Sequence, residues 1–179
     1  MNEPSPLWSS ATRYCPQRGF PPYRFVPGLN PHPKAHPQGH SYGVPEEKPT
    51  YLPPERWKEN FPYLFGFDLY HQGYFWESHE VWECLWHLTR KEEAEGQFLQ
   101  GLIQNAAAQL KKHLEHEDAA CRLSDEAIRR FEFVQARAPK IFMGVDISEL
   151  LQSMRSDHET HSGSRSRVLV SSPLFRLHE

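Results

Sequence analysis

The central part of the chain alternates hydrophobic and polar positions with the period of an α-helix. Four such segments follow one another, at about 61–72, 74–89, 93–115 and 117–137. Gly73 ends the first, and Pro139 follows the last. A fifth, shorter helix is predicted at about 146–155, with Asp146 as its N-cap. Short connections and the lack of any competing strand pattern predict an all-α, antiparallel helical bundle of four to five helices.

The residues before this bundle have a different pattern. Thirteen of the 16 prolines lie before residue 55, and proline imposes an extended backbone. A disordered tail is one interpretation. The aromatic residues, including Tyr23, Phe25 and Tyr42, favour an extended arm that packs on the bundle. At the other end, Leu174 and Phe175 could dock in the same way. The predicted organisation is an arm at 1–55, a helical bundle at 56–155 and a loose tail at 156–179.

Composition narrows the class of protein. The 179 residues carry a net charge of −3, which provides no positive field for nucleic acid. No apolar stretch reaches the length of a membrane span, and the start of the sequence does not resemble a signal peptide. Three widely spaced cysteines indicate free thiols in a reducing compartment. We therefore expect a cytoplasmic protein that binds neither nucleic acid nor membrane, and that could form a homodimer.

The second predicted helix carries a set of polar residues beside its buried face. On a helical projection His79 and Glu83, four residues apart, lie at the border of that face, next to Trp86. Glu77 and Glu80 fall further round and are expected to be exposed to solvent. A histidine and a glutamate in this position can form a hydrogen bond, or they can contact a ligand.

The third predicted helix shows a similar border. Gln100 and Gln104 are also four residues apart and flank an apolar face. If the second and third helices pack against each other, these amides could share one seam with His79 and Glu83. The four groups could satisfy one another, or they could line a pocket.

The same region has part of a metal-binding pattern. His79 begins the run HEVWE, which differs from the zinc motif HExxH by a glutamate, Glu83, at its last position. Two ligands are too few for a tight site. His71, or His32 and His40 from the arm, are the candidates for further ligands of a divalent metal.

Three pieces of this region together resemble the Domain of Unknown Function 309 family, over roughly residues 64–131. They are Gly73, the aromatic–Glu–x–His–Glu segment that continues to Trp86, and the run FLQGLIQ at 98–104. The segment 23–43 also resembles an N-terminal extension of some members. The resemblance implies a small all-helical protein, mostly bacterial or archaeal, without an established reaction. Carried over by position, the shared polar residues are Glu77, His79, Glu80, Glu83, Gln100 and Gln104.

Three functions are compatible with these observations. The favoured hypothesis is a polar pocket that binds a small ligand or a metal, with His79 at its centre. The second is a metal-dependent hydrolase that uses Glu80 as its base. The third is a structural or protein-interaction module whose polar seam only fixes the helix register. The sequence assigns no reaction and no substrate.

Overall fold

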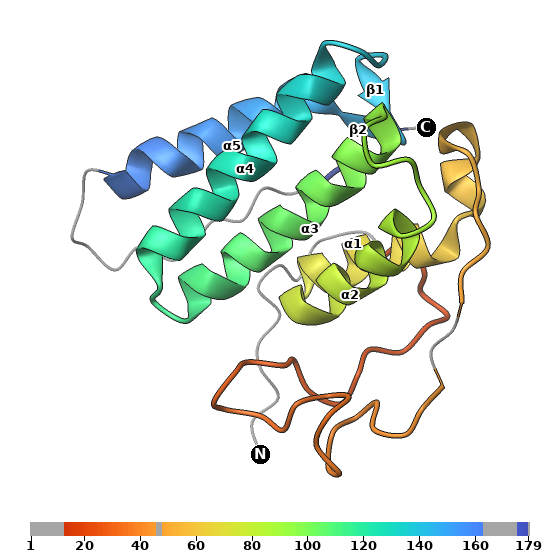
Figure 1. Cartoon of the computed structure of the whole chain (residues 1–179), viewed down its shortest axis with the longest axis vertical. Helices are drawn as coiled ribbons and strands as arrows, with labels where there is room; N and C mark the ends of the chain where they lie inside the picture. Colours follow the sequence, from red (N-terminus) through yellow and green to blue (C-terminus); the bar gives the residue numbers. More distant parts are fainter. Residues whose placement is uncertain (1–12, 46–47, 163–174, 179) are drawn as a thin grey trace.

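The computed structural model describes residues 13–45, 48–162 and 175–178 and confirms the all-α prediction (Figure 1). The helices are the 3₁₀ helix η1 (Pro54–Glu59), α1 (Phe61–His71), α2 (Phe75–Trp86), α3 (Ala94–His113), α4 (Glu117–Gln135) and α5 (Ile147–Ser162). The strands are β1 (Ile141–Phe142) and β2 (Val145–Asp146). No helix in these ranges has both the length and the apolar character needed to cross a membrane.

Side-chain caps and a glycine mark the ends of α1 and the start of α5. The side chain of Asn60 accepts the N–H of Tyr63 at 3.1 Å and caps α1. Gly73 has φ +76° and ends that helix, as predicted. Asp146 caps α5, because its carboxylate accepts the N–H groups of Ser148 and Glu149 at 3.0 and 3.1 Å. The last helix is longer than predicted, since it continues past residue 155 to 162.

A small hairpin precedes α5, where the sequence showed no strand. β1 and β2 pair antiparallel, with Phe142 opposite Val145. Gly144 has φ +82° in the turn, a conformation that glycine adopts without strain. Leu177 near the C-terminus forms a further antiparallel bridge with Val145. Strands of two residues are too short to show an alternating pattern, which is why the sequence did not predict them.

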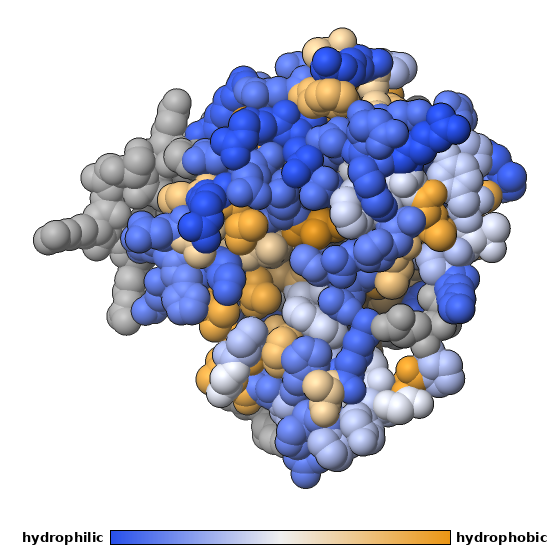
Figure 2. Space-filling view, in the orientation of Figure 1, coloured by the Kyte–Doolittle hydropathy of each residue, from blue (hydrophilic) through white to orange (hydrophobic). Residues whose placement is uncertain are grey.

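The helices form a layered bundle around α1 and α3. α3 packs on both α2 and α4, α4 packs on α5, and α1 packs on α2 (Figure 1). The N-terminal segment runs along the side of α1 and α2, and the hairpin lies at the opposite end of the bundle (Figure 1). The surface of the molecule that is visible in this orientation is mostly hydrophilic (Figure 2). α2 and the N-terminal segment lie against α1, and all residues of α1 from 63 to 71 are buried.

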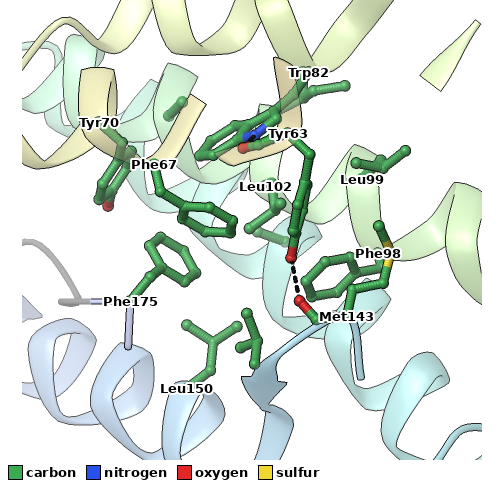
Figure 3. Close-up of a cluster of buried hydrophobic side chains, with 14 of the residues drawn as sticks. Tyr63, Phe67, Tyr70, Trp82, Phe98, Leu99, Leu102, Met143, Leu150 and Phe175 are labelled. Atoms are coloured by element: carbon green, nitrogen blue, oxygen red, sulfur yellow. Dashed lines mark hydrogen bonds between the residues drawn. The ribbon is translucent and has the colours of Figure 1, made fainter. Parts of the chain in front are cut away.

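The core is rich in aromatic residues. Trp82 is fully buried and donates its indole N–H to the carbonyl of Tyr63. The Tyr63 hydroxyl donates in turn to the carbonyl of Met143 at 2.7 Å (Figure 3). A Cβ at Gly66 would overlap the Trp82 indole, so this glycine permits the close contact of α1 and α2. Phe175 is buried in the same cluster, as predicted for the docking end, whereas Leu174 lies outside the described residues.

The arm packs on the bundle over residues 13–45. The buried carboxylate of Asp68 on α1 accepts the backbone N–H groups of Tyr14 and Cys15, both at 2.8 Å. Phe20 stacks on Tyr74 with ring centroids 5.4 Å apart. These contacts confirm an extended N-terminal arm in the described part of the chain. The domain boundaries at 55 and 155 remain predictions.

Candidate functional site

Three polar residues of α2 lie close together on the helix surface. His79, Glu80 and Glu83, here named the α2 cluster, each offer a ligand atom, and these atoms lie within 4.8 Å of one another. Among the side chains that the structure describes, this is the one such group of three or more. His79 Nε2 is 3.8 Å from Glu83 Oε2, which is too long for a hydrogen bond. Both side chains are partly exposed, so water can reach the cluster.

The arm brings a positive charge to this cluster. Lys34 Nζ lies 2.6 Å from Glu80 Oε2, in a hydrogen-bonded ion pair. Both side chains are partly exposed to solvent, at 38% and 23%. An exposed pair of this kind is worth at most about 1 kcal/mol. The pair can therefore open at little cost.

Glu77 was expected to be exposed, and that prediction is wrong. The residue is only 5% exposed, because the arm covers this side of α2. Its Oε1 accepts the N–H of Phe25 at 2.9 Å and lies 3.2 Å from His40 Nε2. Its Oε2 is buried without a hydrogen-bond partner among the described residues. Burial raises the pKa of Glu77, and the hydrogen bonds from Phe25 and His40 act in the opposite direction.

The arm histidines do not join the α2 cluster. His40 is held between Glu77 and Ser41, and its Nδ1 is 2.8 Å from Ser41 Oγ. The His32 ring packs against Trp76, with centroids 5.3 Å apart. Trp76 of α2 therefore touches the arm.

The two glutamines of the third helix belong to a different seam. Gln104 donates to Glu126 and accepts from Arg130, both at 2.8 Å, and both partners lie on α4. Gln100 is half-buried on α3. The structure therefore separates Gln104 from the α2 cluster and places it between α3 and α4. Whether these residues bind a ligand stays a prediction.

The remaining predicted residues are enclosed by neighbours. Trp86 is half-buried against the core, and the ammonium of Lys91 lies 3.7 Å from its ring centroid. His71 is buried between Tyr14 of the arm and Phe175 of the tail. Neither of its ring nitrogens has a hydrogen-bond partner among the described residues. Burial lowers the pKa of His71 from 6.5 to about 4, so its imidazole is neutral at pH 7. His71 is not part of the α2 cluster.

A cavity lies elsewhere in the molecule. It has a volume of about 200 Å³ and lies between β2, the first turns of α5 and the C-terminal segment. Its lining includes Asp146, Glu149, Phe175 and His178. None of the site residues predicted from the sequence lines it.

Sequence reasoning missed three residues that shape this region. Asp68 and Lys34 anchor the arm, and Ser41 extends the contacts of the buried glutamate on α2. Lys34 and Ser41, and the arm residues that contact Asp68, lie in a segment without a periodic signal. No local pattern could therefore have identified these contacts.

Comparison with known proteins gives a family match for the central part of the chain. The sequence model of the family described as Domain of unknown function (DUF309) matches residues 63–123, from α1 into α4. No curated protein matches the chain. The match includes the α2 cluster, Glu77, Gln100 and Gln104, and it excludes the arm. Residues 63–123 of this chain therefore carry a domain of the DUF309 family, as its motifs predicted.

Proposed function

We propose that the protein is a helical module that binds one divalent cation through the α2 cluster. The observation that supports this function is the convergence of three ligand atoms, from His79, Glu80 and Glu83, within 4.8 Å. All three residues lie within two turns of one regular helix, so the backbone sets the positions of their Cβ atoms before any cation binds.

The donor set favours a first-row transition metal. An imidazole nitrogen and two carboxylate oxygens are common ligands of Zn²⁺, and they also suit neighbouring divalent ions. Partial exposure of the cluster leaves at least one coordination position for water. Because His40 and His32 have other contacts in the arm, binding is better supported than the metal-dependent hydrolase, which was expected to recruit them.

The test is a calorimetric titration of the full chain with ZnCl₂ and MnCl₂. The protein is prepared without a histidine tag and freed of metal by a chelator. We expect one saturable site per chain for at least one of the two ions. His79→Ala should weaken its affinity at least about tenfold, since one of three protein ligands is lost.

His87→Ala is the matched control, because His87 is an exposed histidine just beyond the last turn of α2. It should leave the affinity unchanged. Absence of saturable binding to the wild-type chain, or equal affinities of wild type and His79→Ala, would contradict the proposed function.

A further inference from the structure

Three side chains from the arm and α2 form a hydrogen-bonded series. Glu77 Oε1 lies 3.2 Å from His40 Nε2, and His40 Nδ1 lies 2.8 Å from Ser41 Oγ. The first two side chains are buried, at 6% and 5% exposure, and Ser41 is half-buried. A buried carboxylate and a buried imidazole thus connect to a half-buried hydroxyl.

The two hydrogen-bond partners of His40 determine the tautomer of its imidazole, that is, which ring nitrogen carries the proton. The Glu77 oxygen also accepts the N–H of Phe25, so it serves as an acceptor towards its neighbours. His40 then donates from Nε2 to Glu77, which leaves Nδ1 as the acceptor for the Ser41 hydroxyl. A hydroxyl bound to a base that a third group orients is the arrangement that activates serine nucleophiles.

We propose that Ser41 is an activated nucleophile that accepts an acyl group from esters of apolar carboxylic acids. His40 is its general base, and Glu77 is a positioning residue that orients the imidazole. The proposal does not depend on the cation site, because these residues contact one another and not the α2 cluster.

The surroundings of Ser41 suit an apolar acyl group. Tyr42 and Val44 are 52% and 61% exposed and follow Ser41 directly in the arm. Between them Gly43 has open space on the side where a Cβ would lie. Figure 2 shows hydrophobic residues among hydrophilic ones in the lower part of the view, where Figure 1 places the arm. A substrate can therefore approach from solvent and cover exposed apolar side chains.

The chemical step balances without a cofactor. Ser41 Oγ forms a bond to the ester carbonyl carbon while its proton moves to His40 Nδ1. The bond from that carbon to the leaving alcohol oxygen then breaks, and the alcohol takes the proton from His40. Water attacks the acyl-serine by the same route in reverse, which releases the carboxylic acid and restores the serine.

The primary experiment is labelling of the full-length protein with a biotinylated fluorophosphonate. Ser41 Oγ displaces fluoride from phosphorus and forms a stable adduct, which peptide mass spectrometry locates. Ser153 on α5 is the internal control, because it is half-buried like Ser41 and has no histidine neighbour in sequence. We expect labelling of Ser41 to be about 100-fold faster than labelling of Ser153, the contribution typical of a general base.

The variants separate activation from folding. His40→Gln should slow labelling of Ser41 about 100-fold, while His36→Gln, an exposed change in the same arm, should not. Amide hydrogen exchange of residues 13–45 shows whether the arm stays docked in each variant. An unlabelled Ser41, or a rate unaffected by His40→Gln while the arm stays docked, would overturn the proposal.

Two further measurements keep the test decisive if His40→Gln releases the arm. The wild-type protein should release nitrophenolate from p-nitrophenyl butyrate in a burst of one equivalent, and Ser41→Ala should abolish it. Among the described residues His40 faces Glu77 of α2 and Ser41 and Tyr23 of the arm. Glu77→Gln should therefore change the pH profile of labelling, which a purely structural residue would not do. No burst in the wild type counts against the proposal.

Discussion

α2 carries three glutamates within two turns, and their exposure to solvent differs. Glu77 is buried and accepts hydrogen bonds from the arm. Glu80 and Glu83, in the α2 cluster, stay partly exposed. A buried carboxylate must be satisfied by fixed partners, whereas an exposed one can exchange water for a cation at small cost. The arm therefore decides which glutamate is buried and which ones stay accessible to a cation.

The largest expected effect concerns stability. Glu77→Ala would leave the N–H of Phe25 and the imidazole of His40 buried without an acceptor. We expect the free energy of unfolding to fall by about 2–4 kcal/mol. Glu83→Ala, on the exposed side, should change it by less than about 0.5 kcal/mol. Urea denaturation of both variants measures the difference, and equal losses would show that burial by the arm contributes nothing.

A buried and an exposed histidine, His71 and His87, should differ in how they affect stability as the pH changes. Its pKa is about 4 in the folded protein and 6.5 in an ordinary environment, so the unfolded chain takes up a proton first as pH falls. As the pH falls from 6.5 to 4, the titration of this residue therefore lowers the free energy of unfolding by about 3 kcal/mol. His71→Leu should remove that share of the loss, while the exposed His87→Leu should not. Denaturation of wild type and both variants at several pH values checks the prediction, which identical pH dependences would contradict.

The next effect is on cation affinity. Glu83→Gln removes one charged ligand of the α2 cluster and should weaken cation binding about tenfold, or about 1.4 kcal/mol. Glu92→Gln makes the same change at an exposed position in the loop after α2 and serves as control. Calorimetric titration measures both. Equal weakening by the two variants would indicate a general effect of charge and not coordination.

The smallest effect tests the contact between arm and cluster. Lys34 holds Glu80 and must release it before a cation takes that carboxylate. Lys34→Met should therefore raise cation affinity about two- to fivefold, the value of an exposed ion pair. Lys48→Met is the matched control, because Lys48 is an exposed lysine of the same segment. Equal affinities in wild type and Lys34→Met would show that the arm does not compete, and the cation site itself would remain.

Much of the fold could be predicted because its signals are local. The helical period located α1 to α4 within about three residues, and Gly73 and Asp146 marked a helix end and a helix start. The β1–β2 hairpin escaped prediction because its strands have two residues each. The length of α5 was underestimated, since its second half has no strong apolar period.

The candidate site was predictable only in part. The spacing of His79 and Glu83 along one helix follows from sequence, and the structure brings them near Glu80. The partners of Gln104 depend on which helix faces it, and they lie on α4 instead of α2. The burial of Glu77 depends on the arm, which a helical projection does not include.

The sequence alone determined the all-α class, the central helices and the DUF309 match of residues 63–123, because each rests on local spacing of side chains. Tertiary structure decided the path of the arm, the burial of Glu77 and His71 and the partners of the polar residues. Most of these features arise where segments far apart in the sequence meet, as Phe25 meets Glu77, 52 residues away. A proline-rich segment has no period to indicate which backbone N–H will face a carboxylate. Only the packed chain specifies that contact.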